Sequence, residues 1–186
     1  MAHYQQPYYV GLLSAAAIHG AAHQQPQTFQ VITNKPLRPI KVRSSSINFF
    51  TKQHIIPESY QSTKTPSGYM QVSIPETTAL DLIRYIKSVG YLHHATTVLV
   101  ELQEKFDKER FIHILDVEAP EITCVQRLGY LLEMIGASQE IIFLLKQWIN
   151  EKNPQYIPLR SDKIYQKSEK NVDWHLYINE VIEADI

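Results

Sequence analysis

The stretch Val72–Tyr85, VSIPETTALDLIRY, contains the point at which a strand pattern gives way to a helical one. Residues 67–73, SGYMQVS, alternate as a half-buried strand does. From Pro75 to Gly90, apolar residues recur every three or four positions instead. Proline suits the first helical turn, because its missing N–H has no helical partner to lose there. We therefore expect a helix to begin at Pro75 directly after a strand, with Ser73 as its cap.

The same stretch holds two carboxylates, which raises the question of catalysis. Glu76 falls in the first helical turn, where a negative charge meets the positive end of the helix dipole and stabilises the helix by about 0.3–1 kcal/mol. Asp81 follows five residues later, roughly 140° around the axis. The two therefore do not share a face, as an acid/base pair on one helix would. Asp81 is spaced for a local contact with Arg84 or Tyr85, and we interpret the stretch as a helix start.

Outward from this point, the chain is predicted to have an α+β fold, with an N-terminal helix, a small mainly antiparallel sheet and a packed helical half. We expect two parts, 1–74 and 75–186, packed as one integrated domain. The predicted strands are 27–33, 38–43 and 46–51, in an antiparallel meander, and 67–73; the predicted helices are 7–20, 75–90, 92–106, 108–118, 121–136 and 138–153. We expect 57–66 to be a loop, 154–173 to be a partner-binding arm or a surface loop, and 174–179 to return to the sheet as a closing strand.

The composition is that of an ordinary globular protein. The 186 residues are 44% hydrophobic and 20% charged, and no run of about 18 apolar residues occurs. The N-terminus lacks the basic-then-apolar order of a signal peptide. A single cysteine, Cys124, excludes an internal disulfide framework and fits a reducing compartment. These features predict a cytoplasmic protein without a membrane association.

Charge is divided unevenly along the chain. Residues 1–80 contain six Lys/Arg and two acids, a net charge of +4, whereas residues 81–186 contain twelve and seventeen, a net charge of −5. Such a division can indicate an acidic partner for the first half, either nucleic acid or protein. It is equally consistent with lysines that are simply solvated on one face.

No catalytic or metal-binding motif emerges. His19 and His23 have the spacing of two ligands on one helical face, but Gly20 between them is expected to end the helix and no acid completes a site. Cys124 lies in a helical pattern, where a buried structural cysteine is commoner than a nucleophile. Nucleophile elbow, P-loop and dinucleotide fingerprints are absent, and the acid–lysine cluster ELQEK, 101–105, lies in a helical pattern. We predict no enzyme and no cofactor.

The first half contains one compact basic set, Lys35, Arg38, Lys41 and Arg43. Lys41 and Arg43 are two apart, so they project from one face of a strand. Lys35 and Arg38 flank the turn that leads into it. These four residues could contact phosphates and bind nucleic acid with an affinity that falls as salt rises.

Several segments in order resemble the AbiEi family of antitoxins, and the resemblance extends over most of the chain. The segments are YYVGLLSAAAIHG (8–20), FQVIT (29–33), INFF (47–50), PETTALDLIRY (75–85), RLGYLLEMIG (127–136) and WHLYINEVIEADI (174–186). The first and fourth are the strongest part of the resemblance.

The resemblance implies an antitoxin domain that counteracts a nucleotidyltransferase toxin in a type IV toxin–antitoxin system linked to phage abortive infection. Family members typically carry an N-terminal winged helix that binds the operon's promoter. Only seven residues precede the first matching segment, so we expect the winged helix to be absent from this chain, which is then either a piece of a longer protein or a stand-alone antitoxin domain. The family has no catalytic motif to transfer. Its positively charged surface gives Lys35, Arg38, Lys41 and Arg43 a use in promoter binding and autoregulation.

Two other hypotheses remain open from the sequence. One is a DNA-binding transcriptional regulator whose basic strand contacts phosphates, which predicts binding that weakens steeply with salt. The other is a nuclease or other hydrolase, which predicts metal-dependent cleavage of DNA or RNA that is lost when one acid is replaced. The identity of the toxin, and whether it is contacted directly, are left open.

Overall fold

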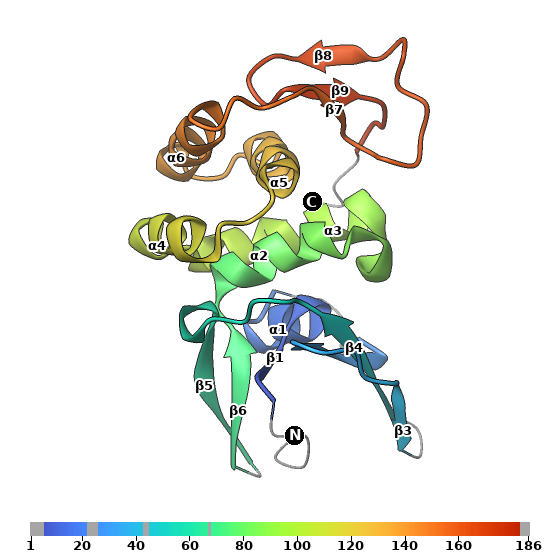
Figure 1. The fold of residues 1–186 in the computed structure, drawn as a ribbon, viewed down its shortest axis with the longest axis vertical. Helices are drawn as coiled ribbons and strands as arrows, with labels where there is room; N and C mark the ends of the chain where they lie inside the picture. Colours follow the sequence, from blue (N-terminus) through green and yellow to red (C-terminus); the bar gives the residue numbers. More distant parts are fainter. Residues whose placement is uncertain (1–5, 22–25, 43–44, 67, 183–186) are drawn as a thin grey trace.

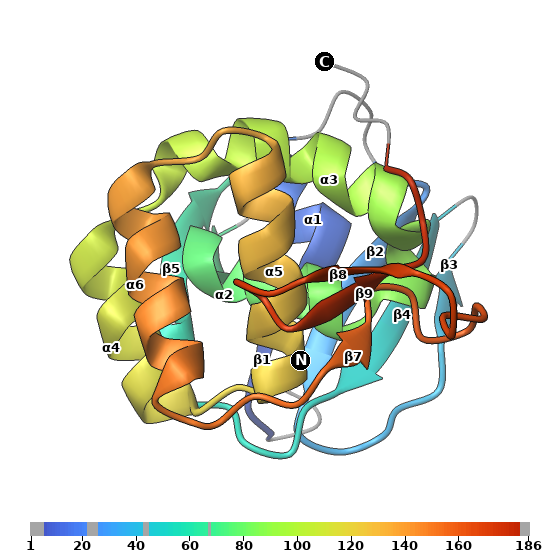
Figure 2. The ribbon, with the colours of Figure 1, turned by 90° about the horizontal axis from the view of Figure 1, so that it is seen from above.

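The computed structural model describes residues 6–21, 26–42, 45–66 and 68–182 (Figure 1). A six-stranded sheet lies at one end of the long axis and a three-stranded sheet at the other, with the helices layered between them. The view from above shows the small sheet crossing over α5 and lying beside α3 (Figure 2). This arrangement confirms the α+β class, with helices packed in the second half.

The strands and helices have the following bounds. The large sheet contains β1 (Tyr8–Val10), β2 (Thr28–Thr33), β3 (Ile40–Val42), β4 (Ser45–Thr51), β5 (Tyr60–Thr65) and β6 (Gly68–Ser73), and the small sheet contains β7 (Ile157–Pro158), β8 (Glu169–Asn171) and β9 (Leu176–Ile178). The α-helices are α1 (Leu12–Ile18), α2 (Pro75–Arg84), α3 (Tyr91–Leu102), α4 (Lys108–Glu118), α5 (Ile122–Met134) and α6 (Gln139–Asn150). In the described part of the chain, the short 3-10 turns are η2 (Pro57–Ser59), η3 (Ile86–Val89) and η4 (Gln103–Lys105).

The large sheet is mixed, with strand order β3-β4-β2-β1-β6-β5. The pairs β3–β4, β1–β2 and β5–β6 are antiparallel, whereas β2–β4 and β1–β6 are parallel. The predicted meander of antiparallel strands is therefore wrong at one pairing. The strand β4 lies between β3 and β2 and pairs in parallel with β2. The other edge of β2 is occupied by β1.

Three local predictions fail because tertiary pairing overrides local propensity. Residues 8–10 form β1 rather than the first turn of a helix, and α1 begins only after Gly11. Residues 60–65, expected to be a loop, form β5, whose polar sequence is held by hairpin pairing with β6. The strand β9 joins β7 and β8 in the small sheet instead of returning to the large one.

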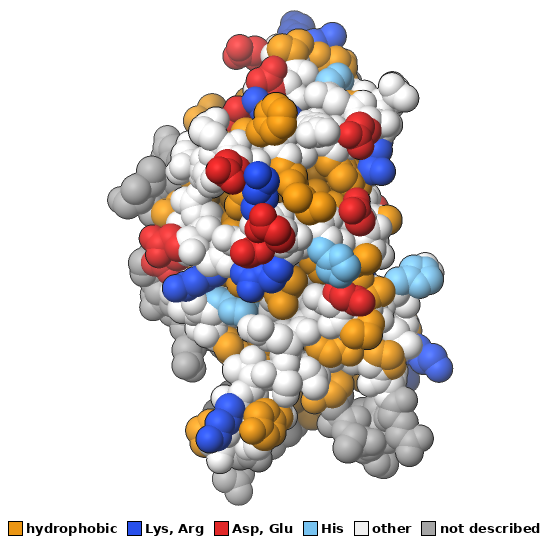
Figure 3. All heavy atoms as spheres, turned by 90° about the vertical axis from the view of Figure 1, so that its left-hand side faces the viewer, with side chains coloured by type: hydrophobic (Ala, Val, Ile, Leu, Met, Phe, Trp, Pro, Cys, Tyr) orange, Lys and Arg blue, Asp and Glu red, His pale blue; other side chains and the backbone are white. Residues whose placement is uncertain are grey.

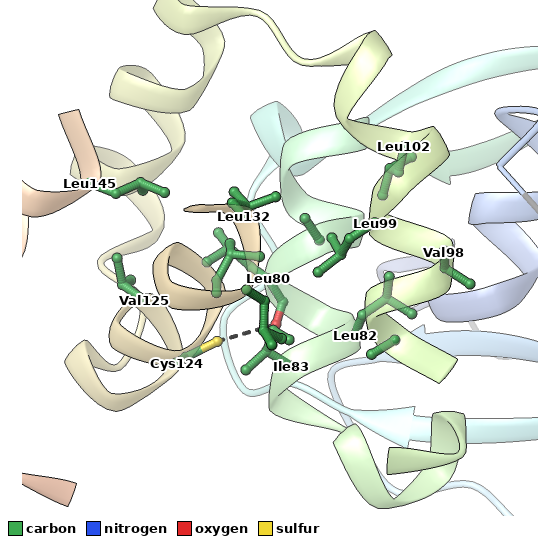
Figure 4. Close-up of a cluster of buried hydrophobic side chains, with 14 of the residues drawn as sticks. Leu80, Leu82, Ile83, Val98, Leu99, Leu102, Cys124, Val125, Leu132 and Leu145 are labelled. Atoms are coloured by element: carbon green, nitrogen blue, oxygen red, sulfur yellow. Dashed lines mark hydrogen bonds between the residues drawn. The ribbon is translucent and has the colours of Figure 1, made fainter. Parts of the chain in front are cut away.

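The helix α2 is the centre of the molecule and contacts α1, α3, α4 and α5. All its residues from Pro75 to Ile83 are buried. Leu80, Leu82 and Ile83 meet side chains of α3 and α5, such as Leu99 and Val125, in one apolar cluster (Figure 4). A helix buried on all sides is expected to be apolar throughout, yet α2 also buries four polar residues: Glu76, Thr77, Thr78 and Asp81.

The start of α2 differs in one detail from the prediction. Pro75 and Glu76 do occupy the first turn, but the N-cap is Ile74 and no side chain caps the helix. Ser73 belongs to β6, and its hydroxyl pairs with that of Thr78 at 2.6 Å. Because the strand continues into the helix with no intervening turn, Ser73 lies one residue too early to act as the cap.

The small sheet is attached to the helices through Trp174. Its ring is fully buried, and Nε1 donates to Oε2 of Glu133 on α5 at 2.6 Å. The ring lies against the backbone of Gly129, where an added Cβ would meet a ring carbon at 2.0 Å. A helix-interior glycine is therefore required here by close approach. Among the described residues, no helix is long and apolar enough to cross a membrane.

We expect Gly129→Ala to destabilise the protein by about 1–3 kcal/mol or more, because the new methyl group overlaps the Trp174 ring. The measurement is urea unfolding followed by circular dichroism. In a Trp174→Leu background the same change should cost much less, since the ring is gone. An equal cost in both backgrounds would refute the contact as the reason for the glycine.

Candidate functional site

The predicted basic set lies at one edge of the large sheet. Lys41 is on β3, the edge strand, and Lys35 and Arg38 lie in the segment between β2 and β3; all three are exposed. Arg43 lies outside the described residues. Within the part of the chain that the structure describes, Lys35, Arg38 and Lys41 form no ion pair. Their charges are thus available to an acidic partner.

A second polar group, which the sequence analysis did not assemble, is centred on Asp81. The Asp81 side chain is fully buried. Its Oδ2 accepts from the Tyr9 hydroxyl at 2.6 Å, and its Oδ1 accepts from Arg84 Nη1 at 2.9 Å. Lys52, just after β4, places Nζ 3.4 Å from the same Oδ1 and 3.2 Å from the Tyr9 oxygen. The predicted local pair between Asp81 and Arg84 is confirmed, and two distant residues complete it.

The group continues onto the end of α4. Glu118 forms ion pairs with Lys52 and with Arg84, the latter at 3.3 Å, and accepts from the Ser59 hydroxyl at 3.1 Å. Arg84 Nη2 also bonds Glu121 at 2.8 Å. We call Tyr9, Lys52, Asp81, Arg84, Glu118 and Glu121 the ionic cluster. It joins β1, the end of β4, α2 and the α4–α5 connection.

The pKa shifts in the ionic cluster follow from burial and charge. Burial, and then the negative charge of Asp81, raise the pKa of Tyr9 well above its ordinary value. Burial lowers the pKa of the Arg84 guanidinium, but Asp81, Glu121 and Glu118 outweigh it and raise that pKa overall. Burial and Asp81 likewise raise the pKa of Tyr85 to about 12. Tyr9, Tyr85 and Arg84 therefore stay protonated at neutral pH.

The ionic cluster borders a surface cavity of about 290 Å³. Lys52, Arg84, Glu118 and Glu121 line it, together with His54. Both cations are paired with carboxylates, and each carboxylate accepts from at least one cation. Because each charged group of the ionic cluster faces a group of opposite charge, the role that this arrangement supports is to hold the sheet and the helices together.

Glu76, the other carboxylate of the opening stretch, belongs to a separate contact. Its Oε1 accepts from the backbone N–H of Asp107 at 2.7 Å and from Arg110 Nε at 3.3 Å. Burial raises the pKa of Glu76, although Asp107 and Arg110 oppose the shift. As predicted, Glu76 and Asp81 face different neighbours and do not form an acid/base pair.

The histidine and cysteine candidates are held in structural contacts. His19 Nε2 lies 2.7 Å from the carbonyl oxygen of Ser73 and donates to it, and burial lowers the pKa of His19. His23 lies outside the described residues. Within the described ranges, no group of three or more His, Cys, Asp or Glu could hold a metal ion. Cys124 is buried and donates from Sγ to the Leu80 carbonyl at 3.2 Å (Figure 4).

The sequence of this fold matches a family of antitoxins. The family model of the AbiEi antitoxin C-terminal domain matches residues 9–134. The chain therefore belongs to the AbiEi antitoxin family, as its resemblance indicated, and is an antitoxin domain. No curated protein matches it.

Among solved structures, the chain is similar to the RV2827C protein from Mycobacterium tuberculosis, with a TM-score of 0.61 at 12% identity. The match covers 94% of this chain and 63% of that one, so the chain spans less than two thirds of the matched protein's length. At this identity the likeness describes the fold alone.

We expect Asp81→Asn to destabilise the protein by about 1–3 kcal/mol, because Lys52 and Arg84 would lose the buried carboxylate that both contact and would keep only Glu118 and Glu121 as counter-charges. Chemical unfolding at pH 7 measures the loss. Glu140→Gln, which breaks an exposed pair with Lys108, is the matched control and should have little effect. Equal losses in both variants would show that the ionic cluster contributes no more than a surface pair.

The raised pKa of Tyr9 predicts that the free energy of unfolding depends on pH in the alkaline range. The unfolded chain loses the Tyr9 proton near pH 10, whereas the native state holds it to higher pH. This stabilising contribution is complete below pH 10 and is lost as pH rises above it. The slope of unfolding free energy against pH should therefore be shallower in Tyr9→Phe than in the wild type. An unchanged slope above pH 10 would refute this.

Burial raises the pKa of the Cys124 thiol to about 12, so native Cys124 should react very slowly with iodoacetamide at pH 8. Mass spectrometry after timed quenching measures the modification. The denatured chain should react at the rate of a free thiol. Rapid modification of the native protein would show that the α2–α5 contact opens readily.

Proposed function

We propose that this antitoxin domain counteracts a nucleotidyltransferase toxin in a type IV toxin–antitoxin system of the abortive-infection kind, as a regulatory protein without catalysis of its own. The match of residues 9–134 to the AbiEi antitoxin domain carries the proposal. The contacts support it, because the buried titratable groups of the ionic cluster are paired with one another. Groups that are paired in this way hold the folded structure together, and they are poorly placed to attack a substrate.

A growth assay tests the proposal. If the gene beside this one encodes a nucleotidyltransferase, that enzyme would be induced in a host with and without the antitoxin domain. We expect the domain to restore growth. Gly129→Ala, in which the added methyl group overlaps the Trp174 ring and lowers stability, supplies a destabilised variant for comparison at equal expression. Failure of the folded wild type to rescue, with both proteins detected, would overturn the proposal.

We propose a second role for the exposed edge of the large sheet, in promoter binding and autoregulation. The specific observation is that Lys35, Arg38 and Lys41 are exposed and carry no ion pair among the described residues. Arg43 is assigned to the same set from its spacing to Lys41. If this role is the main one, the chain acts as a DNA-binding regulator rather than as an antitoxin in its own right.

Charge reversal separates these roles. A Lys35→Glu/Arg38→Glu/Lys41→Glu variant should bind promoter DNA more weakly at every sequence, and its salt slope should fall by about 1 per lost phosphate contact. Reversal of three exposed lysines elsewhere, Lys105, Lys152 and Lys167, is the matched control for net charge. Fluorescence anisotropy at several salt concentrations measures both. Equal loss in the two variants would attribute binding to net charge alone.

A further inference from the structure

A surface cavity beside η3 is lined by several cationic side chains, and the proposed antitoxin role gives it no function. It has a volume of about 350 Å³ and lies between η3, the start of α3, α5 and the loop after β7. Four cationic side chains line the cavity, Arg84, Lys87, Arg127 and Arg160, against one carboxylate, Asp162.

Two of these cations are already neutralised. Arg84 belongs to the ionic cluster and pairs with its carboxylates. Arg160 bonds Asp162 at 2.7 Å and Glu180 at 2.5 Å, and its guanidinium lies 4.3 Å from the centre of the Tyr91 ring. These contacts hold Arg160 in one position at the cavity wall.

The other two cations, Arg127 and Lys87, form no ion pair within the part of the chain that the structure describes. Arg127 is half-buried and bonds only backbone carbonyls, those of Leu159 at 3.0 Å, Pro158 at 3.1 Å and Thr123 at 3.4 Å. A guanidinium has five N–H donors, so two remain beyond these three bonds. Burial without a carboxylate lowers the pKa of Arg127. Lys87 is exposed at the cavity edge.

A half-buried charge without a counter-charge is costly, and a bound anion would remove that cost. Arginine and lysine together recognise phosphate oxygens. Ser88 and Ser161 also line the cavity, and a serine hydroxyl can donate to a phosphate oxygen. Its volume is many times the roughly 30 Å³ that a water occupies in the liquid, so an organic group fits beside the phosphate.

We propose that this cavity binds a small phosphate-bearing molecule of the size of a mononucleotide. Arg127 and Lys87 neutralise the phosphate, and the apolar wall formed by Leu92 and Leu159 contacts the organic group. The site is separate from the basic edge of the large sheet and does not depend on the proposed antitoxin activity.

Isothermal titration calorimetry tests the proposal with inorganic phosphate, AMP and ATP as probes and citrate as an anion without phosphorus. We expect AMP or ATP to bind the wild-type chain, with citrate at least tenfold weaker. Lys87→Glu should weaken the nucleotide by roughly tenfold or more, the usual effect of losing a charged hydrogen bond. Lys105→Glu, an equal charge change at an exposed residue outside the cavity, should leave the affinity unchanged.

Arg127→Gln should abolish binding, but it also removes three bonds to carbonyls and lowers stability with or without a ligand. Lys87→Glu avoids this ambiguity because Lys87 is exposed and has no such bonds. The proposal is overturned if none of the phosphate-bearing probes binds the wild-type chain at a concentration of about 10 mM. It is also overturned if Lys87→Glu binds the nucleotide as tightly as the wild type does, or if citrate binds as tightly as AMP. Binding of inorganic phosphate equal to that of AMP would overturn the nucleotide-sized occupant.

Discussion

The hydrogen bond and ion pairs of Asp81 are the contact on which the rest of the structure depends. This buried carboxylate lies near the middle of α2 and receives a hydroxyl from β1, an ammonium group from the end of β4 and a guanidinium from its own helix. An isolated carboxylate at this depth would cost several kcal/mol. The helix α2 can therefore be buried at the centre only if Tyr9, Lys52 and Arg84 contact the Asp81 carboxylate. The sheet and the helical half are coupled through that requirement.

The same requirement explains why so polar a segment lies at the centre. Polar residues of this kind ordinarily face solvent, but three of those in α2 receive a partner from a neighbouring element: Thr78 from β6, Glu76 from the start of α4, and Asp81 from β1. Apolar side chains, including Leu80 and Leu82 of the common core, are buried around these polar contacts. Such polar contacts specify which elements meet, because a shifted register would leave a buried charge without its partner.

Much of this could be anticipated from residue pattern. The helical bounds around Pro75, Ser138 and Gly136 follow from periodicity and end signals, and the local pair between Asp81 and Arg84 follows from spacing. Tyr9 and Lys52 could not be assigned to the same group, because they lie 72 and 29 residues from Asp81 and neither falls in a recognisable motif. The only available signal was a lysine directly after a strand of apolar and aromatic residues.

The sequence by itself determined the class of fold, the family, the strand-to-helix junction at Pro75 and the concentration of basic residues before β4. These depend on local period, proline chemistry and the order of short motifs, which act over a few residues. The tertiary structure alone decided that residues 8–10 pair as a strand, that β2 and β4 run parallel, that the last strand builds a second sheet, and that Arg127 lines a cavity with no ion-pair partner of its own among the described residues. Those outcomes depend on which distant partners satisfy a backbone edge or a buried charge, and no local pattern encodes that choice.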